Sequence, residues 1–398
     1  MTSAGPEHYE KHVPREVPHD VAMRVARAWG IEARRPRGAR KAGLDFGIVF
    51  PSYPDAWRDA AVAEDHGFTH AWFYDSQMLY SDVYVCMALA AEHTRRIKLG
   101  TFVAIPASRI SPVTAHSIAT INQLAPGRTV LGMGTGFTGR NTMGLPPVPL
   151  RTLREHVEQC RKLLRGEEVL YREGGRERWI RFLHPDRGYI NLRDHIPIHI
   201  AATGPKALRL VGEIGEGWIT VMHAPETLAR ERKTIAAAAR AQGRDLEDPY
   251  TSILTTACVT RPGESALAPR VIERVGPFAI VFHHVLWEGA AVSADIGGDL
   301  RDGYQAYERE YVARMKTPED RRYLEVHEGH LVYLKPGEER FLSERLIEGS
   351  TLVGPAGQII ERLKALEEAG LSNVAIQVVT SGRELIEEIG NEVIAKYR

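Results

Sequence analysis

The stretch that decides the fold runs from Ile97 to Asn141 and reads IKLGTFVAIPASRISPVTAHSIATINQLAPGRTVLGMGTGFTGRN. Residues 97–103 and 128–133 are mainly apolar with several β-branched side chains, which is typical of strands buried on both faces. Between them, the Ser111–Pro112 pair predicts a helix start and the Pro126–Gly127 pair predicts a helix end. The stretch is therefore a strand–helix–strand unit, the building block of a parallel sheet.

The same alternation of strands and helices continues on both sides of this stretch. Each predicted strand except the last leads into a helical pattern or a helical insertion. The predicted strands start at Leu44, His70, Ile97, Arg128, Ile196, Trp218, Thr251 and Asn373. Eight such units predict the α/β class and a closed (β/α)8 barrel of the TIM type. A doubly wound open sheet is the alternative, which the number of strands disfavours.

Three segments do not follow this alternation. Residues 1–43 are charged and contain prolines, and they predict an N-terminal extension before a barrel that occupies residues 44–398. Residues from about 166 to 195 are polar and aromatic, with a glycine pair at 174–175, and predict a small hairpin. Residues from about 262 to 350 are helical, aromatic and charged, and predict a larger insertion in the barrel.

Composition excludes several classes of partner and compartment. The 398 residues carry 51 basic and 51 acidic side chains, which gives no argument for nucleic acid or an acidic membrane as a partner. No segment approaches the roughly 18 apolar residues of a membrane span, and no apolar export segment follows Arg34–Arg35. Cys86, Cys160 and Cys258 are far apart and predict no disulfide framework. We therefore expect a cytoplasmic protein.

The loops at the carboxyl ends of the predicted strands carry mostly small or apolar residues. In a barrel these loops form the active site, and such a site is suited to a flat cofactor that does the chemistry. Residues 134–139 match GxGxxG, but three prolines delay the next predicted helix to about Leu150, so we do not interpret them as a dinucleotide fingerprint. Residues 202–206 follow a strand and open a helix, which suits either a phosphate or an ordinary helix start.

Histidines of the larger insertion come close to a metal-binding pattern. His327 and His330 are one residue short of the HExxH spacing, Gly329 weakens a helix between them, and no third ligand suggests itself. We therefore expect no metal site. His283, His284 and His327 are expected to be solvated loop residues, with a substrate pocket as the alternative.

Six segments resemble the luciferase-like flavin and deazaflavin oxidoreductases, in particular the branch around methylenetetrahydromethanopterin reductase. They are FGIVFPS (46–52), HAWFYD (70–75), DVYVCMALAAEHTRRIKLG (82–100), SPVTAHSIATINQLAPGRTVLGMGTG (111–136), IPIHIAATGPKALRLVGEIGEGW (196–218) and TLVGPAGQIIERLKALEEAGLSNV (351–374). Their order and spacing carry the resemblance. It implies a TIM-type barrel that binds coenzyme F420, a deazaflavin, or FMN in close relatives, and it implies a homodimer.

The resemblance also points to site residues. The cofactor-binding candidates are Asp75, Phe102, Val103, Ala104, Gly134, Thr135, Gly136, Asn141, Ala202, Thr203 and Gly204. By the resemblance, Asp75 would approach the cofactor ring and the Phe102–Val103 bond would be a non-proline cis peptide behind it. Residues 202–204 would meet the phosphate of the cofactor side chain.

The chain departs from its relatives at positions that carry their acid–base chemistry. Val49 and Phe137 stand where relatives have glutamate, and Ser76 stands where they have histidine. We therefore expect hydride transfer between coenzyme F420 and a small organic substrate of open identity, with His223 and Ser76 as candidate proton donors. An FMN-dependent two-component monooxygenase of the same fold and a non-catalytic flavin-binding barrel are the alternatives.

Overall fold

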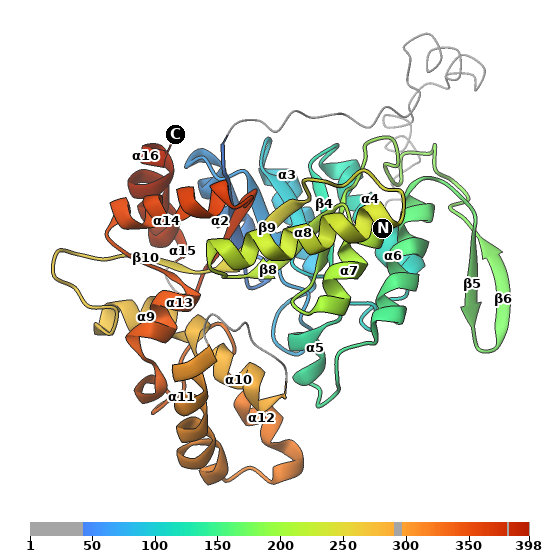
Figure 1. Cartoon of the computed structure of the whole chain (residues 1–398). Coiled ribbons are helices and arrows are strands. Elements are labelled where there is room, and N and C mark those ends of the chain that lie inside the picture. Colours follow the sequence, from blue (N-terminus) through green and yellow to red (C-terminus); the bar gives the residue numbers. More distant parts are fainter. Residues whose placement is uncertain (1–42, 290–296, 380–381, 398) are drawn as a thin grey trace, which may run out of the picture.

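The computed structural model describes residues 43–289, 297–379 and 382–397. Within these residues, eight parallel strands close into a barrel in the order β1-β12-β9-β8-β7-β4-β3-β2 (Figure 1). The predicted TIM-type barrel is confirmed, whereas the predicted extension at residues 1–43 lies outside the described residues except for Gly43. The barrel strands are β1 (Asp45–Phe50), β2 (His70–Phe73), β3 (Lys98–Thr101), β4 (Thr129–Met133), β7 (Ile198–Ala201), β8 (Gly217–Val221), β9 (Tyr250–Thr255) and β12 (Asn373–Gln377).

Helices cover the outside of the barrel, and their apolar faces pack on the strands in one continuous core. They are α2 (Ala56–Asp65), α3 (Val83–His93), α4 (Ser111–Leu124), α6 (Leu150–Leu164), α7 (Pro205–Ile214), α8 (Pro225–Ala241), α14 (Ala356–Glu368) and α15 (Gly382–Ile389). The Asp82 carboxylate caps α3 by accepting hydrogen bonds from the backbone N–H groups of Tyr84 and Val85, at 2.9 and 3.1 Å. After α15 the chain forms a π-helical turn (Gly390–Ile394) and α16 (Ala395–Tyr397).

Trp72 fills the centre of the barrel interior and is fully buried. It lies in register with Val49 on β1 and with Gly100 on β3. A Cβ atom on Gly100 would lie 2.3 Å from the indole ring, and one on Gly47 would lie 2.7 Å from the indole nitrogen. The two glycines therefore provide the space that the indole needs, and the indole N–H donates to Asn373 Oδ1 at 3.1 Å.

Replacing Gly100 with alanine is therefore expected to lower the free energy of unfolding by about 1–3 kcal/mol, because a rigid ring must move to admit one methyl group. Urea unfolding followed by tryptophan fluorescence measures the loss. Gly357→Ala is the matched control, since this glycine is exposed on α14 and no described atom lies within 4 Å of its Cβ position. Equal stability of the two variants would contradict the role given to Gly100.

Two segments interrupt the barrel, as the sequence predicts. The first is an antiparallel hairpin of β5 (Val169–Glu173) and β6 (Arg176–Ile180), which projects away from the barrel (Figure 1). The second lies between β10 (Ala257–Val259) and β11 (Leu352–Gly354), which pair with each other in parallel. It contains α9 (Pro269–Ala279), α10 (Val281–Trp287), α11 (Gly297–Glu310), α12 (Arg322–Val326) and α13 (Glu344–Ser350).

The core of the helical insertion is continuous with the barrel interior. One apolar cluster contains Trp72, Phe102 and Ile219 of the barrel together with Phe278 and Tyr307 of the insertion. The insertion therefore packs on one end of the barrel, as the layer formed by α10, α11 and α12 shows in Figure 1. The end that it covers carries the loops in which the sequence predicts the site.

The structure contains one short helix that the sequence analysis did not predict. The next helix after β4 was expected near Leu150, but α5 (Phe137–Asn141) already begins behind Gly136. Gly136 adopts a left-handed conformation, with φ of 85°, that lets the chain turn directly from the strand into the helix. Because α5 has only five residues, it ends before the proline-rich segment that precedes α6.

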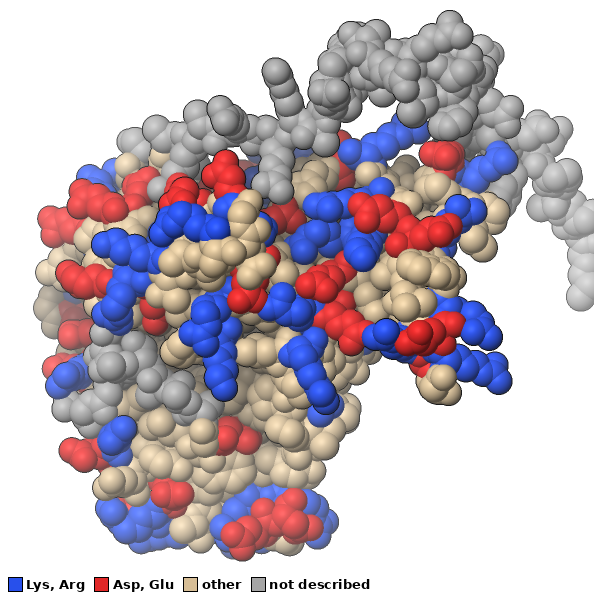
Figure 2. Space-filling model, turned by 45° about the vertical axis from the view of Figure 1, so that its right-hand side comes forward, with Lys and Arg blue, Asp and Glu red and all other residues tan. Residues whose placement is uncertain are grey.

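The outer surface carries charges of both signs. In the face that Figure 2 shows, acidic and basic side chains are interspersed and neither sign forms one large patch. None of the helices in the described part of the chain is long and apolar enough to cross a lipid bilayer.

Candidate active site

A cavity of about 330 Å³ opens at the carboxyl ends of the barrel strands. Its wall is mostly apolar and includes residues of β7, β8 and β9 and of the loops that follow β2, β3, β4 and β7. Nine of the candidate residues line it: Asp75, Ser76, Phe102, Val103, Gly134, Thr135, Gly136, Ala202 and Thr203. Parallel strands bring these distant segments to one end of the barrel, as expected for this fold.

Four candidates lie outside this lining. Ala104 is buried and forms an isolated bridge with Met133 of β4. Asn141 is buried at the end of α5, and Gly204 stands at the start of α7 beside Thr203. His223 is also buried, and its Nε2 lies 2.8 Å from Thr220 Oγ1. Thr220 does line the cavity, so one hydroxyl group separates His223 from it.

The loop after β3 and the loop after β4 pack tightly against each other. The peptide bond between Phe102 and Val103 is cis, as the resemblance implies. A Cβ atom on Gly134 would lie 2.7 Å from Val103 Cγ2, and one on Gly136 would lie 2.4 Å from Ile105 Cγ2. The close contact between the two loops therefore requires glycine at both positions. The cavity wall that results is smooth and consists of backbone and small side chains.

Asp75 is the one carboxylate among the residues that line the cavity, and it is 5% exposed. Arg109 Nη1 donates to both of its oxygens at 2.8 Å, and Arg109 Nη2 donates to Asp82 Oδ2 at 2.6 Å. Burial raises the pKa of Asp75, while the Arg109 guanidinium opposes that rise. Sequence reasoning singled out Asp75 but missed Arg109, which lies in the loop between β3 and α4.

Two tyrosines and part of the insertion complete the wall. Tyr74 donates its hydroxyl hydrogen to Gln377 Oε1 at 2.5 Å, and burial raises the pKa of Tyr74 well above its usual range. Tyr80 donates to the His330 carbonyl at 2.9 Å, and Gln377 Nε2 donates to the Leu331 carbonyl at 2.7 Å. These contacts hold Leu331 in the cavity wall. No short-range pattern in the sequence links these positions.

The start of α7 lies at the rim of the cavity. Its N-cap is Gly204, with φ of −112° and ψ of 158°, and Pro205 occupies the first turn. No described atom lies within 4 Å of a Cβ built on Gly204, so the space in front of the helix start is open. The N–H groups of a first helical turn have no partner within the helix and attract anions. This position can therefore hold a phosphate group next to Ala202 and Thr203.

The histidines of the insertion are buried, contrary to the expectation of solvated loop residues. His283 and His284 are each 1% exposed on α10, and His327 and His330 are each 2% exposed in the turn after α12. The sequence interpretation was wrong here because the aromatic residues of this segment form a core of their own around Tyr307. None of these four side chains lines the cavity.

Comparisons with known proteins agree with this geometry. Residues 33–373 match the family described as luciferase-like monooxygenase. The chain is 31% identical over 277 residues to 5,10-methylenetetrahydromethanopterin reductase of Methanolobus tindarius, a match that covers 65% of this chain and 80% of the reductase. It is 32% identical over 204 residues to F420-dependent glucose-6-phosphate dehydrogenase of Microbacterium testaceum, covering 50% of this chain and 57% of that protein.

The fold also matches a solved structure. The coenzyme F420-dependent tetrahydromethanopterin reductase of Methanopyrus kandleri superimposes with a TM-score of 0.67 and 24% identity, over 90% of this chain and 100% of that chain. At this identity the likeness concerns the fold, and it includes the helical insertion because almost the whole of each chain is covered.

Proposed function

Because this chain belongs to the luciferase-like monooxygenase family, we propose that it is an oxidoreductase that transfers a hydride between coenzyme F420 and a small organic substrate. The observation that carries the proposal is the cavity at the barrel end, which has a smooth apolar wall and the open start of α7 at its rim. Relatives named for F420-dependent activity support the deazaflavin as the cofactor.

The residues present fit a flat cofactor that carries a phosphate. Phe102, Val103 and Gly134 offer a surface without charge on which a planar ring can lie. Gly204 leaves open space in front of α7, where a side-chain phosphate would accept hydrogen bonds from backbone N–H groups. Asp75, fixed by Arg109, borders the ring position.

When bound, the deazaflavin supplies hydride donation or acceptance at its ring. The chain supplies orientation, because a wall fixed by tight loop packing holds the reactants in one geometry. The apolar side chains around the cavity, among them Ile105, Ile219 and Leu254, exclude water from the reacting face. The substrate would then share the cavity with the ring and contact Leu331 and Tyr80, which also line it.

Two residues are proposed to handle a proton. Ser76 lines the cavity and can present its hydroxyl directly to a substrate. His223 acts through Thr220, whose hydroxyl lies 2.8 Å from His223 Nε2 and borders the cavity. Neither route uses the two glutamate positions of the relatives, where this chain has Val49 and Phe137, whereas Ser76 stands at their histidine position. We therefore propose a substrate of different identity from the methanopterin and sugar phosphate in the relatives' names.

We also propose a homodimer in the cytoplasm. An apolar surface supports the dimer: Val85 on α3 and Ile110 and Val113 at the start of α4 are 56, 45 and 42% exposed, and the two helices pack against each other. The three buried free thiols Cys86, Cys160 and Cys258 are typical of a reducing compartment. Light scattering of the purified protein tests the dimer.

A titration of the purified protein with coenzyme F420 and with FMN tests the proposal. We expect saturable binding of F420 with one site per chain, and weaker binding of FMN, measured by fluorescence quenching. Tight FMN binding without F420 binding would overturn the cofactor assignment. Oxygen consumption with reduced FMN would then favour the monooxygenase alternative, and no turnover with either cofactor would favour a non-catalytic barrel.

A further inference from the structure

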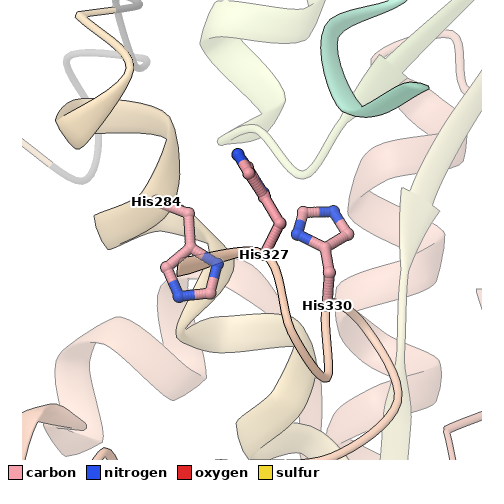
Figure 3. Close-up of side chains that lie close together, drawn as sticks. All are labelled: His284, His327 and His330. Atoms are coloured by element: carbon pink, nitrogen blue, oxygen red, sulfur yellow. The ribbon is translucent and has the colours of Figure 1, made fainter. Parts of the chain in front are cut away.

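Three buried histidines of the helical insertion lie together outside the cavity. His284 projects from α10, and His327 and His330 project from the turn after α12 (Figure 3). One ring nitrogen of each histidine lies within 4.8 Å of those of the other two. The three side chains are at least 98% buried, so bulk water does not solvate these nitrogens.

The outer side of each ring has a hydrogen-bonding or charged neighbour. His327 Nε2 lies 2.7 Å from Glu288 Oε1, and His330 Nε2 lies 3.2 Å from Thr138 Oγ1. His284 Nε2 makes no hydrogen bond within the described residues, but the Glu338 carboxylate is its charged neighbour, with Oε1 at 3.5 Å. Metal-binding histidines characteristically hold a carboxylate or hydroxyl on the nitrogen that does not bind the ion.

The remaining nitrogens have no partner. Within the described residues, the Nδ1 atoms of His284, His327 and His330 are buried and make no hydrogen bond. Leaving one buried polar atom unsatisfied costs about 1–3 kcal/mol, so three in one place require an explanation. An ion between the rings would satisfy all three at once.

The charges around the cluster suit a divalent cation. Two carboxylates, those of Glu288 and Glu338, face the rings, and the Lys335 ammonium lies 2.9 Å from Glu338 Oε1. The buried rings offer imidazole nitrogens, which are common ligands of zinc-type ions.

We propose that His284, His327 and His330 bind one divalent transition-metal ion of the zinc type. Three imidazole nitrogens at about 2.0–2.1 Å from the ion, with a fourth position left for water, form a common zinc arrangement. Nitrogens around a tetrahedral ion lie about 3.4 Å apart, so small rotations of the rings complete the site. Hard cations such as Mg²⁺ and Ca²⁺ prefer oxygen ligands and are disfavoured here.

The site would stabilise the part of the insertion that forms the cavity wall. His330 is followed directly by Leu331, which lines the cavity, and Thr138, the outer partner of His330, lines it as well. An ion would join this turn to α10 through His284. Its expected role is therefore to fix the wall, and it does not depend on which cofactor occupies the cavity.

Metal binding to the full-length protein tests the proposal. After treatment with a chelator, we expect the wild-type protein to bind one equivalent of Zn²⁺ in competition with a chromophoric chelator, and to show a higher Tm with Zn²⁺ than without it. Substitution with Co²⁺ is expected to give the intense visible bands of a tetrahedral site. Failure of the wild-type protein to bind either ion would overturn the proposal, whatever the variants do.

Variants distinguish this site from a surface site. His327→Gln and His330→Gln are expected to abolish the stoichiometric binding, and Glu288→Gln to weaken it about 10–100-fold. His283→Gln is the matched control, because His283 is equally buried on α10 but bonds the Phe341 carbonyl at 3.0 Å. Retention of full binding by both ligand variants would overturn the proposal, and circular dichroism checks that each variant is folded.

Discussion

Replacing Arg109 with leucine is expected to lower the free energy of unfolding by about 3–5 kcal/mol near neutral pH, because it leaves a buried carboxylate without its partner. Both carboxylate oxygens of Asp75 accept a hydrogen bond from Arg109. The Asp75 side chain is only 6% exposed and the Arg109 side chain 18%. Solvent cannot replace the guanidinium at such a site. Urea unfolding at several pH values measures the loss.

The pH dependence of this loss has a defined sign. Burial already raises the pKa of Asp75 against the opposing effect of Arg109, and removing Arg109 raises that pKa further. A carboxyl group whose pKa is raised in the folded state costs stability as the pH rises through that pKa. The deficit of the variant is therefore largest above its Asp75 pKa and shrinks as the pH falls. Arg109 also lowers the pKa of Asp82, although partial burial opposes this. Removing Arg109 therefore raises the pKa of Asp82 as well, and this adds to the stability deficit at higher pH.

Two further variants separate charge from packing. Arg109→Lys keeps the charge but lacks the planar guanidinium that donates to Asp75 and Asp82 together. We therefore expect an intermediate loss of unfolding free energy. Adding Asp75→Asn to Arg109→Leu removes the stranded charge and is expected to recover part of the stability. A loss that is the same at low and neutral pH, without recovery in the double variant, would show that Arg109 acts through packing alone.

The barrel could be predicted from the sequence because a short segment of sequence is enough to identify each of its strands. Each barrel strand lies within two residues of its predicted start, since apolar, β-branched segments between helix caps define it without reference to the rest of the chain. The loops that follow the strands could also be assigned to one site, because a closed parallel barrel brings all carboxyl strand ends together. Asp75, Phe102 and Gly134 follow three of these strands, and all three line the cavity.

The partners of these residues could not be predicted, because they depend on contacts between distant segments. Arg109 reaches Asp75 across 34 positions, and Tyr80 reaches the His330 carbonyl across 250. The histidine cluster has the same origin: His284 and His327 are on separate elements, and no spacing rule joins them. The short helix α5 was missed because a left-handed Gly136 lets it begin without a capping side chain.

Replacing Gly204 with aspartate is expected to weaken the binding of coenzyme F420 at least a hundredfold while leaving Tm equal or higher. The fold tolerates the change, because the backbone at this position is extended and no described atom lies within 4 Å of the new Cβ. Aspartate is also a favourable N-cap, which stabilises a helix by roughly a few tenths of a kcal/mol relative to glycine. Stability alone would therefore make this a beneficial substitution.

Binding should respond in the opposite direction, because the carboxylate would occupy the place proposed for the cofactor phosphate. Two like charges about 4 Å apart near a protein surface repel by about 4 kcal/mol, which exceeds the energy of a hundredfold change in affinity. Gly204→Asn is the control, since asparagine has the same size and caps a helix without charge. Fluorescence titration at low and high salt should show a deficit in the aspartate variant alone, reduced at high salt by screening. Equal affinities of the two variants would mean that the phosphate binds elsewhere and that the start of α7 is an ordinary helix start.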